Sequence, residues 1–293
     1  MSAFEPAVIV RLHNGLGNQL FQYAAARALG RRLGVPTRAD ISGFAKVRDR
    51  QSHEARHELP GLGLEMESAT AEELRGARAP AWWQAKLGKR AAIPALVQNN
   101  GDVPRAAWRA VSAPVYLDGY WQGEEFFAEA REELAESLGR VRPRAASAGW
   151  LEAVQAPGVV AVTVRRGDYV TSQRVRQTLG LLTCDYYQRA LAELSTRTEV
   201  RAAVVFSDDP DWCERELDLG VPYSVCRLDD SLEQFKVAAQ AGMLVIGNST
   251  YAWWAAWIAS QRGARVVMPA RWFVNDRYAA WGAALRVSSW SIA

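Results

Sequence analysis

Two adjacent arginines follow an apolar run in the second half of the chain. The run from Val159 to Val164 is typical of a buried strand, and Arg165, Arg166 and then Asp168 come directly after it. Neighbouring guanidinium groups repel each other, so this arrangement favours an anion bound between them. An arginine fork donates parallel, charge-assisted hydrogen bonds to phosphate oxygens, which makes phosphate a suitable occupant. An ion pair between Arg165 and Asp168 at the strand end is the structural alternative.

Two further apolar runs of the same half are followed by polar residues, namely Ser207, Asp208 and Asp209 after the first run and Asn248, Ser249 and Thr250 after the second. In open parallel sheets, ligands bind in the crevice outside the carboxyl ends of the strands. A helix N-terminus adds unpaired N–H groups and a partial positive charge. These groups predict a nucleotide diphosphate site. The arginines and the helix start would bind the diphosphate, and the two aspartates would accept hydrogen bonds from the nucleoside.

Both polar clusters also have a structural interpretation, because aspartate, asparagine and serine are the residue types that cap helices. Asp209 precedes a proline and a predicted helix, and Ser249 precedes another. Taken singly, each cluster is more typical of a cap. The occurrence of three polar strand ends in one half of the chain favours the ligand site.

A glycine-containing turn, Gly15-Leu16-Gly17-Asn18, lies between a strand predicted over 7–12 and a helix predicted over 19–33. It matches only part of the dinucleotide-binding fingerprint, because the third glycine is missing. Asp40 lies about where a ribose-binding acid would follow. An NAD-type oxidoreductase is therefore a rival hypothesis, although the Arg165–Arg166 strand end has no obvious role in such an enzyme.

Composition excludes several classes of protein. The net charge is only +3, and the arginine pairs are too local to form a nucleic-acid-binding stripe. All three histidines lie in the first 57 residues, so a zinc cage is disfavoured and the second half holds no histidine base. Three cysteines without a C-x-x-C motif are typical of a reduced compartment. The most apolar window, 251–260, is shorter than the about 20 residues that span a bilayer, and no secretory signal is visible. We expect a cytoplasmic protein without a metal, with peripheral membrane contact left open.

Short apolar runs alternate with helical patterns along the second half, which is typical of a doubly wound parallel sheet. Strands are predicted over 159–164, 201–206, 223–227, 243–246 and 264–268, and helices over 186–194, 211–217, 231–241 and 251–261. The first half adds a strand over 37–41, helices over 71–78 and 81–87, a strand over 115–121 and a helix over 123–138. The pattern predicts an α/β protein with two Rossmann-like domains, 1–145 and 158–293, facing each other across a cleft. A linker is expected over 139–158.

Five segments, in this order along the chain, resemble the α-1,2-fucosyltransferases of glycosyltransferase family 11: H-N-G-L-G-N-Q-L-F-Q-Y-A-A-A-R (13–27), D-G-Y-W-Q-G-E-E-F-F (118–127), V-T-V-R-R-G-D-Y-V (162–170), F-S-D-D-P-D-W (206–212) and G-N-S-T-Y-A-W-W-A-A-W (247–257). The resemblance covers nearly the whole chain. It implies a GT-B fold, GDP-L-fucose as the donor substrate, inversion at the anomeric carbon and no obligatory metal or cofactor. It also implies transfer to the 2-hydroxyl of a galactose-type acceptor on an oligosaccharide or glycolipid.

The resemblance implies roles for individual residues as well. Arg165 would contact the donor diphosphate, with Asp168 anchoring the loop, and Asn18 would face the cleft near the transferred sugar. Arg166 would either share the diphosphate or brace the loop. Asp209-Pro210-Asp211 formally matches the D-x-D motif of metal-dependent glycosyltransferases, but the helix predicted after it favours capping. No residue is identified as the general base.

Three positions depart from the pattern that the family usually shows. The chain has Thr163 where the family usually has a histidine before the arginine pair, and Leu179-Gly180 where it usually has histidine and glycine. Asn14 replaces the first glycine of the usual G-G-L-G-N-Q. A related deoxysugar donor, another acceptor, or a nucleotide-sugar sensor without turnover therefore stays open.

Overall fold

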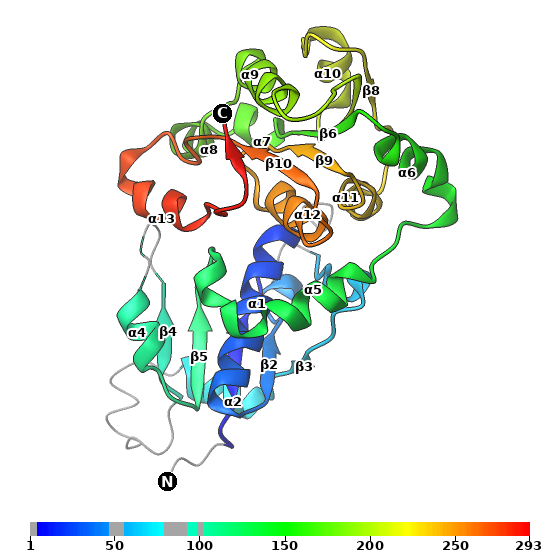
Figure 1. Cartoon of the computed structure of the whole chain (residues 1–293). Helices are drawn as coiled ribbons and strands as arrows, with labels where there is room; N and C mark the ends of the chain where they lie inside the picture. The colour runs from blue at the N-terminus through cyan, green and yellow to red at the C-terminus, as the bar shows by residue number, and fades with distance from the viewer. Residues whose placement is uncertain (1–4, 47–55, 79–92, 99–101, 103) are drawn as a thin grey trace. The chain divides into compact units, whose positions relative to one another are not determined.

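Two parallel β-sheets, one in each of two units, organise the computed structural model (Figure 1). The units are Met1–Ser137 and Leu138–Ala293. The structure describes residues 5–46, 56–78, 93–98, 102 and 104–293. The α/β fold with two Rossmann-like sheets is therefore confirmed, while the cleft expected between the domains stays a prediction.

The sheet of the first unit has the order β3-β2-β1-β5-β4, with all strand pairs parallel among the described residues. Its strands are β1 (Val8–Arg11), β2 (Thr37–Asp40), β3 (Glu67–Ser68), β4 (Ala95–Val97) and β5 (Val115–Asp118). Helix α1 (Leu16–Leu33) packs on β1 and β2, and Gly34 ends it in the left-handed conformation that favours glycine (φ 66°). The strand order reverses beside β1, so the carboxyl ends of β1 and β5 form the topological switch point of this unit.

The rest of the first unit consists of short elements. They are the 3₁₀ turns η1 (Phe44–Lys46), η3 (Leu59–Leu62), η4 (Glu124–Phe126) and η5 (Ala128–Ala130), and the helices α2 (Ala71–Arg78), α4 (Arg105–Ala110) and α5 (Arg131–Gly139). The helix predicted over 71–78 is confirmed, and the one predicted over 81–87 lies outside the described residues. The helix predicted over 123–138 is confirmed over 131–138, where α5 lies, and is wrong before it, where η4 and η5 form instead. Two adjacent, fully buried rings, Phe126 and Phe127, stand at its break, where Phe127 leaves the helical region (φ −133°, ψ 19°).

The second unit has the sheet order β11-β10-β9-β6-β7-β8, again with parallel pairs. The strands are β6 (Val159–Val164), β7 (Ala202–Ser207), β8 (Tyr223–Val225), β9 (Met243–Val245), β10 (Arg265–Met268) and β11 (Ser291–Ile292). Counted from β6, the order is 3-2-1-4-5-6 read from β8 to β11, which is that of dinucleotide-binding sheets. The switch point lies between the carboxyl ends of β6 and β9.

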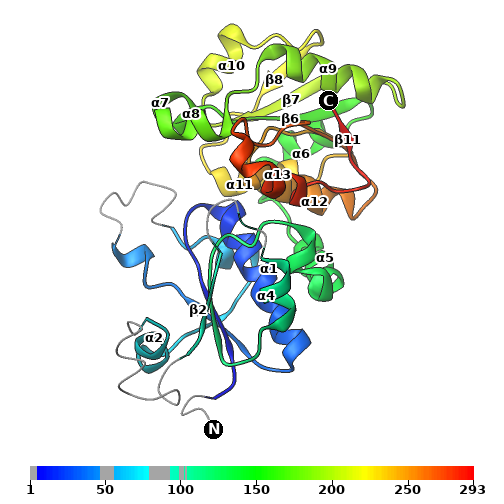
Figure 2. The same ribbon diagram turned by 90° about the vertical axis from the view of Figure 1, so that its left-hand side faces the viewer.

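Helices cover both faces of this second sheet. They are α6 (Ala148–Gln155), α7 (Gly167–Thr171), α8 (Gln173–Leu179), α9 (Cys184–Ser195), α10 (Pro210–Glu216), α11 (Ser231–Ala238), α12 (Thr250–Ser260) and α13 (Ala279–Ala284), with the turns η6 (Ala145–Ser147) and η7 (Asp276–Tyr278). Figure 2 shows α9 and α10 on one face, and α6, α11 and α12 on the other. The segment 139–158 holds η6 and α6, and α6 packs on β6 and β7, so it belongs to the second unit.

Helix α12 shows why the apolar window near 251–260 is a core element. Trp253, Trp254 and Trp257 are fully buried, as expected from the sequence. Each tryptophan buries a large apolar surface, so this helix anchors one face of the sheet. Nowhere in the described part of the chain is there a helix with the length and apolarity that crossing a membrane requires.

Candidate functional site

Hydrogen bonds join the ends of β6 and β9 at the switch point of the second unit. The N–H of Gly247 donates to the Thr163 carbonyl (3.1 Å) and to the Thr163 hydroxyl (3.0 Å). Two buried tyrosines of α9 fix the same strand ends, since the Tyr186 hydroxyl donates to the Ile246 carbonyl (2.6 Å) and the Tyr187 hydroxyl to the Thr163 carbonyl (3.4 Å). These hydrogen bonds hold the ends of β6 and β9 together and so fix the positions of the residues that follow both strands.

Thr163 stands where the family usually has a histidine, and its contacts explain what the threonine does. It is buried, and its hydroxyl is used by the Gly247 N–H. The Thr163 hydroxyl therefore helps to join the ends of β6 and β9.

Arg165 lies at the end of β6 with its guanidinium held by two carboxylates. Its Nε and Nη2 both donate to Asp168 Oδ1 (3.0 and 2.6 Å), and its Nη1 lies 3.1 Å from Asp208 Oδ2. Burial alone would lower the pKa of this guanidinium, but the charges of Asp208 and Asp168 outweigh burial and hold the Arg165 pKa above its ordinary value. The side chain keeps 31% of its surface exposed. The Arg165–Asp168 ion pair, which was the structural alternative, is present. The two carboxylates hold the guanidinium in place but leave part of it exposed to solvent.

Asp208 is the anion that lies beside both arginines. Its Oδ1 accepts the backbone N–H of Arg166 (2.8 Å), while its Oδ2 pairs with Arg165. A Cβ at Gly167 would meet Asp208 Oδ2 at 2.4 Å, so the glycine lets the carboxylate approach the backbone closely. In this structure Asp208 shapes the loop after β6. Its assignment to the nucleoside stays a prediction.

Arg166 is braced on the neighbouring strand end. Its Nε donates to Asp209 Oδ2 (3.1 Å), and its guanidinium carbon lies 3.6 Å from the ring centroid of Trp212. Asp209 also caps α10 by accepting the N–H of Trp212 (3.2 Å), and the Ser207 hydroxyl accepts the N–H of Asp209 (3.0 Å). Asp209 thus has the capping contact that the structural interpretation predicted, Ser207 binds the backbone of that capping residue, and Arg166 has the bracing contact. Their role toward a nucleotide stays a prediction.

The two carboxylates of the D-P-D segment diverge. Asp209 turns to α10 and Arg166, whereas Asp211 pairs with Arg227 Nη1 (2.7 Å). Among the residues that the structure describes, no group of three or more His, Cys, Asp or Glu side chains is placed to hold a metal ion.

The start of α12 lies beside the end of β6. Ser249 is its N-cap residue and forms no side-chain capping bond, and Thr250 is the first helical residue. Both are half-buried. The first-turn N–H groups of a helix have no partner within the helix and carry a partial positive charge. This helix start is the part of the candidate site best suited to an anion.

Asn248 has a structural role that the sequence did not predict. It is 2% exposed, and its Nδ2 donates to the carbonyls of Leu179 (2.6 Å) and Trp272 (3.1 Å). The Tyr169 hydroxyl donates to the Asn248 carbonyl (2.8 Å). Asn248 therefore joins the end of α8, the loop after β10 and the start of α12, and its side-chain amide hydrogens point into the protein.

The N-terminal turn binds an internal carboxylate. Glu58 Oε2 accepts the N–H of Leu16, the first residue of α1, at 2.9 Å. Gln19 is fully buried and fastens this contact, since its Oε1 accepts the N–H of Glu58 (2.9 Å) and its Nε2 donates to the Arg56 carbonyl (2.7 Å). A pyrophosphate in a dinucleotide-binding turn needs this helix start. Gly15 and Gly17 are therefore part of a turn that Glu58 already caps.

The Asp40 carboxylate also has hydrogen-bond partners within the protein. It is 1% exposed, accepts the Tyr116 hydroxyl (2.6 Å) and accepts the N–H of Ser42 (3.0 Å). The NAD-type hypothesis depended on an open helix start after the glycine turn and on an available Asp40 carboxylate. Glu58 caps the helix start, and Asp40 is buried, so neither feature supports that hypothesis.

The switch point of the first unit carries two non-glycine residues with positive φ. Asn14 (φ 63°) follows β1, and Trp121 (φ 54°) follows β5. Asparagine tolerates the left-handed region, which explains why it can stand where the family usually has a glycine. Asn14 Nδ2 donates to the Tyr120 hydroxyl (2.8 Å), and Asn18 Oδ1 accepts from Gln122 Nε2 (2.8 Å). The first bond thus joins the loops after β1 and β5, and the second joins the first turn of α1 to the loop after β5.

Substituting Asn14 separates its conformational role from its hydrogen bond. We expect Asn14→Gly to lower the free energy of unfolding by about 1 kcal/mol, because it loses the bond to Tyr120. Asn14→Ala should lower it by about 2 kcal/mol, because alanine also bears the cost of the left-handed region. Urea unfolding followed by fluorescence measures both. Equal losses for the two variants would contradict the conformational part.

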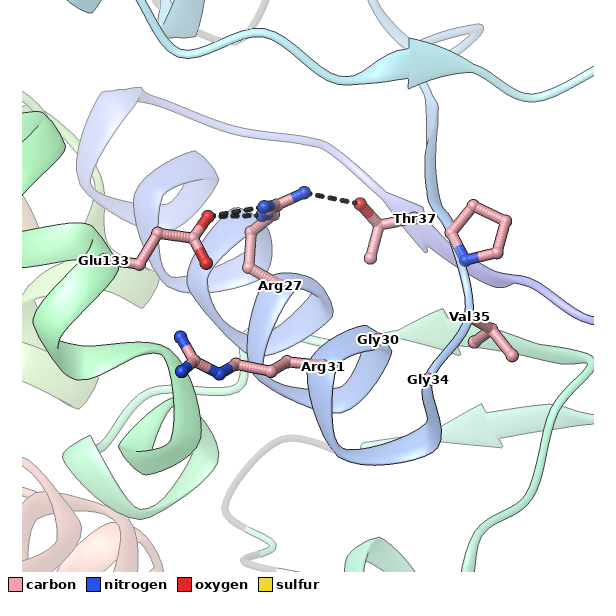
Figure 3. Close-up of a pocket in the computed structure, with 8 residues that line it drawn as sticks. Arg27, Gly30, Arg31, Gly34, Val35, Thr37 and Glu133 are labelled. Atoms are coloured by element: carbon pink, nitrogen blue, oxygen red, sulfur yellow. Dashed lines mark hydrogen bonds and ion pairs between the residues drawn. The ribbon is translucent and has the colours of Figure 1, made fainter.

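A cavity of about 430 Å³ lies at the other end of α1 and belongs to a different part of the first unit. Figure 3 shows the Arg27 guanidinium between Glu133 and Thr37. Arg27 Nε donates to Glu133 Oε1 (2.9 Å), and its Nη1 donates to the Thr37 hydroxyl (3.5 Å). Thr37 opens β2, so the cavity is at the amino edge of the sheet, away from the switch point. It contributes nothing to the candidate site.

Comparison with known proteins assigns the chain to a family. The sequence description of glycosyl transferase family 11 matches residues 100–290, well over half of the chain. The chain belongs to glycosyl transferase family 11. Family 11 enzymes transfer sugars, so this chain is a glycosyltransferase, and the resemblance that the motifs predicted is confirmed.

Two relatives from Escherichia coli are similar to this family 11 chain. An α-1,2-colitosyltransferase is 24% identical over 275 residues, which cover 92% of this chain and 93% of that protein. The O-antigen biosynthesis glycosyltransferase WbnK is 31% identical over 117 residues, which cover 39% of this chain and 38% of that protein. The first relative therefore matches over almost its full length.

Solved structures of lower similarity also match. POFUT1 in complex with GDP gives a TM-score of 0.45 at 14% identity and covers 89% of this chain and 98% of that chain. NodZ α-1,6-fucosyltransferase soaked with GDP-fucose gives 0.44 at 14% identity and covers 87% and 93%.

Proposed function

We propose that this family 11 enzyme transfers a deoxysugar from a GDP-sugar to a hydroxyl of a galactose-type acceptor, with inversion and without a metal. L-Fucose transferred to the 2-hydroxyl is the first candidate. The observation that carries the proposal is the position of Arg165 at the β6–β9 switch point beside the start of α12. Gly247, which precedes Asn248 and Ser249, brings that helix start to the end of β6.

The chemistry follows from the groups at this switch point. As the bond between the sugar and GDP breaks, negative charge grows on the diphosphate. A guanidinium has five N–H donors, and the carboxylates of Asp168 and Asp208 use three of them in the described contacts, which leaves donors for phosphate oxygens. The half-buried start of α12 adds backbone N–H groups and two hydroxyls. Asp168 and Asp208 position the arginine, and Arg165 stabilises the departing diphosphate.

Colitose is the second candidate for the transferred sugar. It differs from fucose by lacking the 3-hydroxyl, and the relative that matches over 92% of the chain is named for its transfer. At Leu179, where the family usually has a histidine, the chain has an aliphatic side chain that cannot form a hydrogen bond. A site with fewer hydrogen-bonding groups discriminates less strongly against a sugar that lacks a hydroxyl.

A direct competition assay tests the proposal. GDP-fucose and GDP-colitose are supplied at equal concentration with galactose-terminated acceptors, and the products are identified by mass and by linkage analysis. We expect one of the two sugars on the 2-hydroxyl of galactose, with the anomeric configuration inverted. Addition of EDTA should leave the rate unchanged.

Calorimetry with GDP distinguishes the enzyme from a nucleotide-sugar sensor. A sensor binds GDP or the GDP-sugar but releases neither a transferred product nor free sugar. Binding without turnover on every acceptor, or transfer from a donor other than a GDP-sugar, would overturn the proposed function.

A further inference from the structure

Two neighbouring segments of the second unit hold a surplus of arginine. The first, 171–184, contains α8, and the second, 269–293, runs from the end of β10 through η7 and α13 to β11. Asp276 is the single acidic residue in both, against five arginines, namely Arg174, Arg176, Arg271, Arg277 and Arg286. Five arginines and one aspartate give these segments a net charge of +4, whereas the whole chain carries +3. The remainder of the chain is therefore close to neutral, and the positive charge of the protein is concentrated here.

Backbone contacts hold the two segments side by side. The N–H of Val274 donates to the Thr178 carbonyl of α8 (3.0 Å). Val274 also packs over Gly180, where a Cβ would collide with the valine side chain. Arg286 Nη2 donates to the Ala270 carbonyl (3.2 Å), which joins the end of α13 to the start of the second segment. Figure 1 shows α8 beside the red segment that leads from β10 to α13. The five arginines therefore belong to one region of the surface.

Most of these arginines keep an uncompensated charge. Arg271 pairs with Asp276 (2.6 Å), so these two charges cancel. The other four, Arg174, Arg176, Arg277 and Arg286, are exposed, and none of them has a carboxylate partner among the residues that the structure describes. Clustered charges of one sign create a potential that attracts ions of the opposite sign. The region is thus suited to an extended anionic partner.

An exposed apolar side chain lies among these charges. Val274 is 47% exposed, and only two other large apolar side chains of the described residues are listed with it as exposed, Val97 and Ile292. The half-buried rings of Phe273 and Tyr278 pack beside it, with centroids 5.5 Å apart. Amphipathic tyrosine rings, basic side chains and apolar side chains occur together where proteins lie at a membrane–water interface.

We propose that this surface docks on an anionic lipid bilayer. We call it the basic patch and define it by Val274 and the four unpaired arginines. The guanidinium groups would bind lipid phosphates, and Val274 would enter the boundary between headgroups and acyl chains. A nucleic acid would also attract the arginines, but its phosphate backbone offers no apolar layer to the valine. The attachment would be peripheral, since the described part of the chain lacks a helix able to cross a membrane.

The basic patch is joined to the candidate site of the same unit through Asn248. The Asn248 amide donates to the Leu179 carbonyl at the end of α8 and to the Trp272 carbonyl after β10. Asn248 also comes directly before the Ser249 cap of α12. Both segments of the patch are thus fixed to the helix start that is suited to an anion. Docking would hold this unit with its switch point close to the lipid headgroups. The inference does not depend on which sugar the enzyme transfers.

Sedimentation of the full chain with lipid vesicles tests the inference. We expect binding to vesicles that contain phosphatidylglycerol and none to vesicles of phosphatidylcholine alone, and high salt should release the protein because it screens the attraction. One arginine near an anionic surface strengthens binding about fivefold, so Arg174→Gln/Arg176→Gln should bind about twenty-five-fold more weakly. Arg277→Gln, with an expected loss of about fivefold, serves if the double variant fails to fold. Val274→Ser should weaken binding without changing its dependence on salt.

Arg189→Gln/Arg215→Gln is the matched control. Both arginines are exposed and have no carboxylate partner in the described part of the chain, but they lie on α9 and α10, which carry acidic side chains as well. This variant loses the same charge and should bind the anionic vesicles within about twofold of the wild type. An equal loss in the control would show that net charge alone governs binding and would overturn the assignment to the patch.

Three other results would overturn the inference. The first is a wild-type protein that ignores phosphatidylglycerol vesicles or binds phosphatidylcholine vesicles equally well. The second is a short oligonucleotide bound as tightly as the anionic vesicles, which would identify a general polyanion site. The third is a loss of GDP affinity in the folded Arg174→Gln/Arg176→Gln protein, which would assign these arginines to the nucleotide. We expect its GDP affinity and melting temperature to match the wild type. None of these results alters the proposed function, which the competition assay tests separately.

Discussion

An Arg165→Ala variant is expected to transfer sugar about a thousandfold more slowly than the wild-type enzyme, with kcat rather than KM carrying most of the loss. The guanidinium is held in place by Asp168 and Asp208 before any substrate arrives, so it needs no rearrangement when charge develops on the leaving diphosphate. Such preorganised stabilisation acts mainly in the transition state, and its removal lowers kcat. Arg165→Lys keeps the charge but loses the fork, and we expect an intermediate loss of about tenfold to a hundredfold.

Arg227→Ala is the matched control for this variant. Arg227 lies in the same unit and also binds two carboxylates, Asp211 (2.7 Å) and Glu214 (2.6 Å), but on the exposed surface of α10. Its removal should leave kcat within about twofold, because exposed ion pairs contribute little. Steady-state kinetics with saturating acceptor, together with melting curves, measure both variants. Full activity in a folded Arg165→Ala protein would refute the role of this residue, and an equal loss in Arg227→Ala would show that any broken ion pair has the same effect.

Much of the second sheet could be predicted because its strands are buried on both faces. Runs such as Val159–Val164 and Ala202–Ser207 are continuous and apolar, and each is followed by polar residues at a strand end. Helix α8 was missed for the opposite reason, and α7 was missed because it has only five residues. Helix α8 buries none of its residues, so its sequence has no apolar periodicity, and only the Ser172 hydroxyl marks its start by accepting the N–H of Val175 (3.4 Å).

The site was predicted by residue type, together with its short-range contacts, the Arg165–Asp168 pair and the Asp209 cap, but its long-range pairings were not. The polar strand ends were identified, yet the contact of Asp208 with the Arg166 backbone joins residues 42 positions apart. The Glu58 carboxylate likewise caps α1 from 42 positions downstream. Such partners are chosen by tertiary packing, which local sequence patterns do not encode.

Asn248 illustrates the difference between a residue that binds a ligand and one that positions the groups that do. The sequence offered it as a donor to the nucleotide, because it precedes the start of α12. The structure shows that its amide instead holds two carbonyls of neighbouring loops. The two interpretations make different predictions for the isosteric change to aspartate.

Asn248→Asp should lower the free energy of unfolding by about 4 kcal/mol at pH 8 and by less at pH 5, because a buried carboxylate would face the Leu179 and Trp272 carbonyls. Burial and the two carbonyls favour the protonated form, so the folded-state pKa of the introduced aspartate is raised above its unfolded value of about 3.9. A raised acid pKa means that the folded protein binds the proton more tightly. The protonated carboxyl can still donate one of the two lost bonds, and this remaining stability is lost as the pH rises through the folded-state pKa.

Melting temperatures of the wild type, Asn248→Asp, Asn248→Ala and Asn275→Asp, measured at both pH values, test this argument. Asn248→Ala loses the same two bonds without a charge, so its loss relative to the wild type should not depend on pH. Asn275 is exposed and caps η7 by accepting the N–H of Arg277 (3.0 Å), which aspartate does equally well, so Asn275→Asp should match the wild type. A stable Asn248→Asp protein that binds GDP more weakly would instead identify Asn248 as a ligand of the nucleotide. If Asn248→Asp is instead destabilised, and its loss of stability relative to the wild type grows with pH, the Asn248 amide has a structural role. It then holds the start of α12 and the two adjoining loops in place.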